Sequence, residues 1–190
     1  MVMVMMLAAA VAVQGPSLGP GPDRLRDVPV AAQEPSGSLT IMVSGVRSSS
    51  PQLKALIDDG VARSKTFTDL VRAIEATDGI VFVEEGRCPG GVAACLEWRV
   101  TLAGSYRMLF VRIASNRAAI KVIASVGHEL QHALEVLQNR SLRRNSDIVL
   151  FYHTPGTIGG VPRAAETRAA TTAGDTVHRE LRRSPGRKRD

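Results

Sequence analysis

The chain has 190 residues, of which 44% are hydrophobic and only 4% are aromatic. This composition suits one domain of about 140 residues with two tails, whose core must consist mainly of Val, Leu, Ile and Ala. The formal net charge of +6 does not predict a nucleic-acid partner, because the basic residues gather at 179–189 without interspersed aromatic residues, as in a solvated tail.

The N-terminal residues 1–13 are almost wholly Met, Val, Ala and Leu. So short an apolar run does not predict a stable membrane span, and it matches the apolar region of a secretory signal. Ala10-Val11-Ala12 offers a small-x-small cleavage site, although no basic residue precedes the run. We therefore predict export to a periplasmic or extracellular compartment. Residues 14–38, rich in Pro, Gly and Ser, predict a linker, and residues 184–190 predict a basic tail.

Residues 39–183 predict a single α+β domain. Four short runs of apolar or alternating residues predict strands, at 39–43, 80–84, 96–102 and 106–113. The last two are expected to form a hairpin across Ala103-Gly104-Ser105. We therefore expect a small antiparallel sheet. Trp98, the only Trp, is expected to fill the core rather than to bind a ligand.

Along the chain, helices are expected both before the hairpin and after it. The first begins after Ser50, with Pro51 at its first position, and runs to about Arg63. The second is capped by Thr66 or Thr68 and runs through Ala76. Two further helices are predicted after the hairpin, at 116–139 and 163–182.

Cys88 and Cys95 bracket a turn between two strand-like runs. In an oxidising compartment these cysteines would most simply form a disulfide that closes this short loop. The alternative is a pair of reduced, half-buried thiols. A metal site is not predicted here, because two cysteines at this spacing make a poor zinc signature.

The run His128-Glu129-Leu130-Gln131-His132 lies inside the predicted helix 116–139. Residues four apart share a helix face, so both imidazoles can reach one metal ion. Two imidazoles suit zinc, and a zinc-bound water can ionise near neutral pH. Glu129 lies near the same cleft and can take a proton from that water.

The rest of this helix supports the arrangement. On a helical wheel, Lys121 and Ser125 share the face of His128 and His132. The opposite face is apolar and is expected to pack on the core; it consists of Val122, Ile123, Val126, Leu130, Ala133, Leu134 and Leu137.

Catalytic zinc usually takes a third protein ligand, and we expect Glu166 to supply it. Glu166 lies one turn before the apolar stripe of helix 163–182, which consists of Ala170, Ala173, Val177 and Leu181. A carboxylate on a buried face needs a partner, and a metal is a good one. The alternative is a half-exposed Glu near a helix N-terminus, favoured by the macrodipole. The remaining histidines are His153 and His178.

Tyr152 and His153 lie in the predicted connection between the helix that carries the two histidines and the helix that carries Glu166. A loop there can overhang the metal, where either side chain could stabilise the oxyanion of a tetrahedral intermediate. The alternative is that both are ordinary loop residues. Arg168 could pair with Glu166 or with a substrate carboxylate, although a solvated arginine is the usual role of such a residue.

The HELQHA run, followed by a later helix that carries Glu, resembles the zincin metallopeptidases, specifically their Glu-ligand branch, the gluzincins. The resemblance covers residues 117–182 and implies zinc on His128, His132 and Glu166, with Glu129 as the catalytic base. Larger gluzincins often carry an acidic residue where this chain has Ala170. No third histidine follows at the metzincin spacing, which argues against that branch.

The sequence therefore predicts an exported zinc-dependent hydrolase acting on a peptide or protein substrate. A second hypothesis is a zinc-binding or interaction protein that keeps the zincin scaffold without catalysis. Glu129 favours the first hypothesis, because holding a metal does not require it. Ala170 and the short chain favour the second. The sequence indicates neither an oligomeric state nor a nucleic-acid partner.

Overall fold

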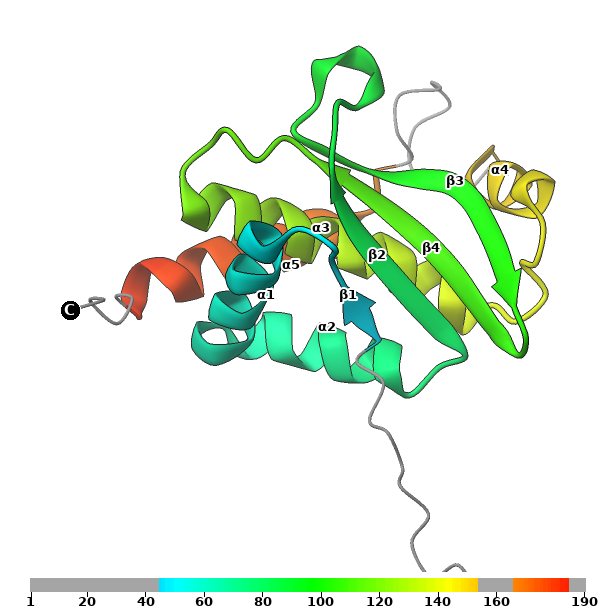
Figure 1. Ribbon diagram of the computed structural model, residues 1–190, viewed down its shortest axis with the longest axis horizontal. Helices are drawn as coiled ribbons and strands as arrows, with labels where there is room; N and C mark the ends of the chain where they lie inside the picture. Colours follow the sequence, from blue (N-terminus) through cyan, green and yellow to red (C-terminus); the bar gives the residue numbers. More distant parts are fainter. Residues whose placement is uncertain (1–44, 154–165, 185–190) are drawn as a thin grey trace, which may run out of the picture. The chain divides into compact units, whose positions relative to one another are not determined.

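The computed structural model describes residues 45–153 and 166–184, which form an α+β fold (Figure 1). The segments predicted at 1–13 and 14–38, and residues 185–190 of the predicted tail, lie outside these ranges. The described elements are β1 (Val46–Arg47), α1 (Pro51–Arg63), α2 (Lys65–Glu75), β2 (Gly79–Glu85), a 3-10 turn (Pro89–Gly91), β3 (Ala94–Ala103), β4 (Tyr106–Ile113), α3 (Ala119–Gln138), α4 (Asn145–His153) and α5 (Arg168–Arg183). Among them, no helix is long and apolar enough to cross a membrane.

The four strands form a mixed sheet in the order β1-β2-β4-β3. The hairpin of β3 and β4 was predicted correctly, but β2 runs parallel to both β1 and β4, so the predicted antiparallel sheet is wrong. The reason is that the hairpin pairs with β2 through its second strand, β4. The alternation of residues along each strand does not encode which strand of a hairpin pairs with the rest of the sheet. β3 is therefore an edge strand. The strand predicted at 39–43 lies outside the described residues.

The first two helices share one serine. Ser50 caps α1 as predicted, accepting a hydrogen bond from the N–H of Leu53. Ser64 ends α1 and also caps α2, where its hydroxyl accepts from the N–H of Phe67 at 3.1 Å. The predicted caps of α2 are therefore wrong: Thr66 and Thr68 already lie within the helix. With a single residue between two helices, the serine at the junction is the first side chain able to cap.

Helix α3 carries the motif and follows the predicted pattern. The seven residues expected on its apolar face are all buried, from Val122 to Leu137. They join the inward side chains of the sheet, among them Val81 and Leu109, in one core. Trp98 packs against that core while partly exposed. Packing of the apolar face on the core therefore turns the face of α3 that carries His128 and His132 away from the core.

Two regions after α3 differ from the prediction. Residues 145–153 form α4, where a connecting loop was expected; Asp147 accepts hydrogen bonds from the N–H groups of Arg143 and Arg144 at its start. Helix α5 begins at Arg168, capped by Thr167, so Glu166 lies just before the helix rather than on its buried stripe. The predicted start at 163 falls outside the described residues. The helix begins later than the apolar period suggested, because Thr167 supplies a side chain that can cap its N-terminus.

Helices α3 and α5 approach closely because glycines stand where they touch. A Cβ on Gly174 would lie 3.1 Å from the Cβ of His128, and one on Gly127 would lie 3.0 Å from Val177. These distances are tight for a packed interface. The two glycines thus let α5 lie directly beside the histidine-bearing part of α3.

The far end of α3 is closed by Arg107, whose side chain is 0% exposed. Its guanidinium forms an ion pair with Asp78 at 2.6 Å and so holds the pKa of that carboxyl below its ordinary value. It also donates to four backbone carbonyl oxygens around the end of α3, those of Val136, Leu137, Asn139 and Leu142. Arg107 therefore satisfies acceptors that a helix end would otherwise leave without partners.

Candidate metal centre

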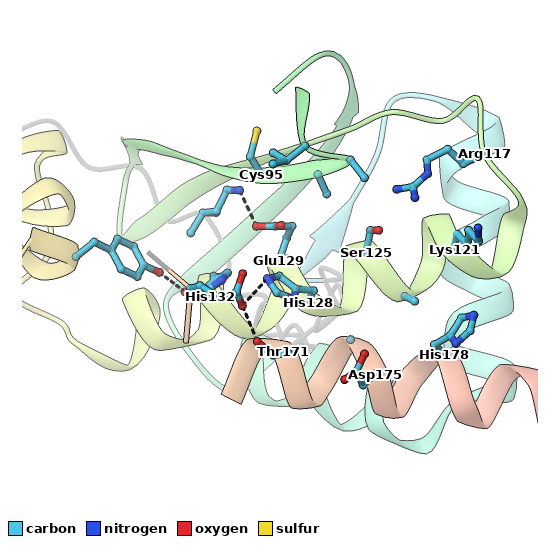
Figure 2. Close-up of a pocket in the computed structure, with 18 of the residues that line it drawn as sticks. Cys95, Arg117, Lys121, Ser125, His128, Glu129, His132, Thr171, Asp175 and His178 are labelled. Carbon is cyan, nitrogen blue, oxygen red and sulfur yellow. Dashed lines mark hydrogen bonds and ion pairs between the residues drawn. The ribbon is translucent and has the colours of Figure 1, made fainter. Parts of the chain in front are cut away.

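The three predicted metal ligands come together in the fold, and Figure 2 shows the two histidines side by side on α3. His128 and His132 lie one turn apart on α3, with ring centroids 5.0 Å apart. Glu166 approaches from the start of α5, and its Oε1 lies 3.3 Å from Nε2 of His128. One ligand atom from each of the three lies within 4.8 Å of the others.

Glu166 reaches this cluster from a different environment than predicted. Its side chain is 55% exposed, so burial does not force it to find a partner. The hydroxyl of Thr171, one turn into α5, lies 2.7 Å from Glu166 Oε1 and fixes the carboxylate on the side of His128. The alternative of an exposed Glu at a helix N-terminus thus describes its surroundings. Arg168 is also exposed and forms no ion pair within the described ranges.

The donor set fits a divalent transition metal. Two imidazoles and one carboxylate are the ligands that such ions accept in proteins. With metal–ligand bonds of about 2.0–2.1 Å, neighbouring ligand atoms of a tetrahedral site lie about 3.4 Å apart. The separation of 3.3 Å between His128 and Glu166 matches this geometry.

Glu129 is held against the cleft by the edge strand. The residue is 7% exposed, and its Oε2 accepts a hydrogen bond from the N–H of Leu96 at 2.8 Å. Burial raises the pKa of Glu129 to about 7, against the lowering effects of His132 and of the Leu96 N–H. A carboxyl with such a pKa can gain or lose a proton near neutral pH, as a general base must.

Sequence reasoning missed Glu135, which orients His132. Nδ1 of His132 lies 3.2 Å from Glu135 Oε2, and the hydroxyl of Thr167 donates to Glu135 Oε1 at 2.7 Å. A carboxylate on Nδ1 fixes the tautomer and leaves Nε2 to face a metal. The signal was present in the sequence, because residues three apart on a helix are neighbours.

These contacts move the pKa values of both partners. Burial disfavours the charged form of His132, but the bond to Glu135 and the charge of Glu129 outweigh it and raise the pKa of His132. Burial likewise opposes ionisation of Glu135, yet the bonds from His132 and Thr167 lower its pKa overall. For His128, burial prevails over the nearby Glu166 carboxylate, and its pKa is lowered. A neutral imidazole is the form that binds a metal.

Tyr152 lines the same cleft, but from helix α4 rather than from a loop. Its phenol donates to the backbone carbonyl of His132 at 3.2 Å, and its ring contacts the His132 ring edge-on. Trp98 stacks on its other side. Burial raises the pKa of Tyr152, so the hydroxyl stays protonated as a donor. The side chain of His153 lies outside the described residues.

The cleft itself has a volume of about 400 Å³. Residues 92–96 and Trp98 form one wall along the edge strand, and the polar face of α3 forms the floor. Lys121 and Ser125, predicted to share this face with the histidines, line the cleft as expected. His178, the fourth histidine of the chain, lies on α5 along the opposite wall.

Cys88 and Cys95 form the predicted disulfide. The bond closes the loop that contains the 3-10 turn and fixes the start of β3. Cys95 lines the cleft and immediately precedes Leu96, the residue that holds Glu129. A disulfide between these residues indicates an oxidising environment.

No protein-family model, curated protein or solved structure matches this chain. What the chain can do must therefore be inferred from the side chains described above. The strongest chemical arrangement among them is the pairing of three possible metal ligands with the buried carboxyl of Glu129.

Replacing Glu135 by Ala should weaken zinc binding about 10- to 100-fold, because His132 loses the acceptor that orients its ring. Glu135→Gln, which keeps an acceptor oxygen, should lie between this variant and the wild type. Affinity would be measured by competition with a chromogenic chelator, and unfolding of the metal-free variants would be compared. Glu75→Gln, an exposed site on α2, is the control. Equal affinities for Glu135→Ala and the wild type would contradict the role of Glu135.

Proposed function

We propose that this chain is a zinc-dependent peptide hydrolase with Glu129 as its general base. The observation that carries the proposal is the position of the Glu129 carboxyl, buried beside the cluster of His128, His132 and Glu166. Holding a metal does not require a second carboxyl group that is buried beside the three ligands and has a pKa near neutrality. Removing a proton from water does require one.

The zinc ion, held by His128, His132 and Glu166, would supply a Lewis acid that polarises a carbonyl and acidifies water. Glu129 accepts the proton of the attacking water and delivers it to the departing amine. The N–H of Leu96 fixes one oxygen of Glu129, leaving the other to face the cleft. Tyr152 lines the cleft and donates its single hydroxyl proton to the His132 backbone carbonyl, so it would have to release that bond to donate to the reacting carbonyl.

The cleft suits an extended peptide. β3 pairs only with β4 within the described residues. On its other edge the N–H of Leu96 is bonded to Glu129 and that of Val100 to Asn145, so an added strand would pair there through other backbone groups of β3. The part of β3 that lines the cleft lies beside the metal ligands. A peptide aligned there would form main-chain hydrogen bonds irrespective of its sequence, while side-chain pockets would set its preference. The disulfide supports an exported protein whose substrates are met in an oxidising compartment.

The test is metal content together with hydrolysis. Purified protein should hold about one zinc per chain and cleave members of a mixed peptide library. His132→Ala should lose both zinc and cleavage. Stoichiometric zinc in a His128→Ala, His132→Ala double variant would contradict the ligand assignment. Zinc binding by the wild type without any cleavage would favour the alternative of a zinc-binding protein without catalysis.

A further inference from the structure

The cleft is electrically polarised along its length. The metal-ligand end holds the carboxyl groups of Glu129 and Glu166, while Arg117 and Lys121 line the other end (Figure 2). Lys121 projects from the first turn of α3, and Arg117 lies in the segment just before that helix. The chemistry of bond cleavage proposed above uses neither cation.

Neither cation has an acidic partner of its own. Across residues 45–153 and 166–184, the ion pairs involve neither Arg117 nor Lys121, and both residues are exposed. Asp175 and His178 face them from α5. Asp175 lies between the two ends of the cleft and also acts on the charge of His128, so its carboxylate is shared between the two ends. The cations therefore leave a positive end of the cleft available to a ligand.

The spacing along α3 fits a peptide. Lys121 precedes His128 by seven residues, and at a rise of 1.5 Å per residue their backbones lie about 10 Å apart along the helix. An extended peptide rises about 3.3 Å per residue, so about three residues span this distance. A peptide with its scissile bond at the metal would place a group roughly three residues away between Arg117 and Lys121.

We propose that Arg117 and Lys121 form a carboxylate-binding subsite, so that the enzyme prefers peptides with a carboxylate about three residues from the cleaved bond. The inference rests on the proposed function for the position of that bond. The carboxylate could be the C-terminus of the peptide or an Asp or Glu side chain. Both sources share the chemistry that two cations recognise, in which the guanidinium donates to both oxygens and the ammonium acts as a point charge.

The effect should be moderate and sensitive to salt. Exposed ion pairs contribute little individually, so two such contacts together should change affinity by about tenfold. Raising the ionic strength from 0.01 M to 1 M shortens the screening length from about 30 Å to about 3 Å, and most of the preference should then disappear. An apolar or backbone-mediated preference would survive the salt.

The experiment measures binding, so that it does not depend on hydrolysis. The zinc-loaded Glu129→Gln protein is titrated into fluorescein-labelled octapeptide libraries of uncharged residues in three forms: C-terminally amidated, free acid, and amidated with Glu at one randomised position. Fluorescence anisotropy gives the affinities. The Arg117→Gln, Lys121→Gln double substitution is then added, and Arg72→Gln, an exposed arginine on α2 outside the cleft lining, is the control.

We expect one or both acidic forms to bind about tenfold more tightly than the amidated form, and the double substitution to remove this difference while sparing the neutral peptides. A gain for the free acid alone assigns the C-terminal carboxylate, and a gain for both assigns any carboxylate. Equal binding of all three forms, including no binding at all, overturns the subsite. So does a preference that persists in the double variant. A carboxylate preference in a wild type that cleaves nothing would keep the subsite and reject the hydrolase.

Discussion

Glu129→Gln should leave the zinc content of the protein unchanged and lower kcat/KM for peptide hydrolysis by at least about 10²-fold. The amide keeps the shape of the side chain, and its oxygen can still accept the hydrogen bond from Leu96. It cannot accept a proton from water. Metal analysis and peptide hydrolysis, measured on the same preparation, separate the two effects.

Glu166→Gln is the matched comparison, because it makes the same chemical change at a proposed ligand. A neutral amide is a much poorer zinc ligand than a carboxylate, so metal and activity should fall together. Loss of zinc by Glu129→Gln to the same extent would show that the two roles are misassigned. Full zinc retention by Glu166→Gln would place the third ligand elsewhere, with His153 as the next candidate.

Arg107→Met should lower the free energy of unfolding by about 3–5 kcal/mol, the usual result of removing one partner of a buried ion pair. The methionine fills part of the volume but leaves Asp78 and the carbonyl groups at the end of α3 without their donor. Chemical denaturation followed by circular dichroism would measure the change. For a domain of this size the midpoint of thermal unfolding should fall by more than about 10 °C.

Arg112→Met is the control on the same strand. Arg112 is half exposed, and its largely buried partner Glu97 keeps a second ion pair with Arg99, so the removal of Arg112 should cost less than about 1 kcal/mol. Equal destabilisation by the two substitutions would mean that hydrogen bonding at the end of α3 contributes little. In that case the stability of the motif helix would come from its apolar face alone.

The motif helix α3 was the part of the fold that could be predicted best from the sequence. A helix as long as α3 repeats its apolar period several times, so the wheel placed both the buried face and the histidine face correctly. Hairpin residues and a helix-opening Pro51 are similarly local signals. The disulfide could be predicted because the two cysteines are close in the chain.

What could not be predicted depends on contacts between distant segments. The pairing of β2 with β4 is set by how the hairpin docks, and α4 is too short for its period to be recognised. Glu166 was chosen for a buried stripe that it does not occupy, yet it still reaches His128. Glu166 therefore joins the cluster from a different environment than predicted, because its position just before the helix cap, rather than burial, places its side chain beside His128.

The disulfide has a consequence for timing. Cys95 is covalently anchored next to Leu96, whose N–H holds the Glu129 carboxyl. Until the thiols are oxidised, the start of β3 lacks this tether. A disulfide that closes a loop of this size stabilises the folded state relative to the unfolded chain by about 2–3 kcal/mol. A hydrolase built in this way would stay poorly assembled in a reducing cytosol, where cleavage could harm the cell. Thiol oxidation, rather than synthesis of the chain, would set the moment at which its chemistry begins.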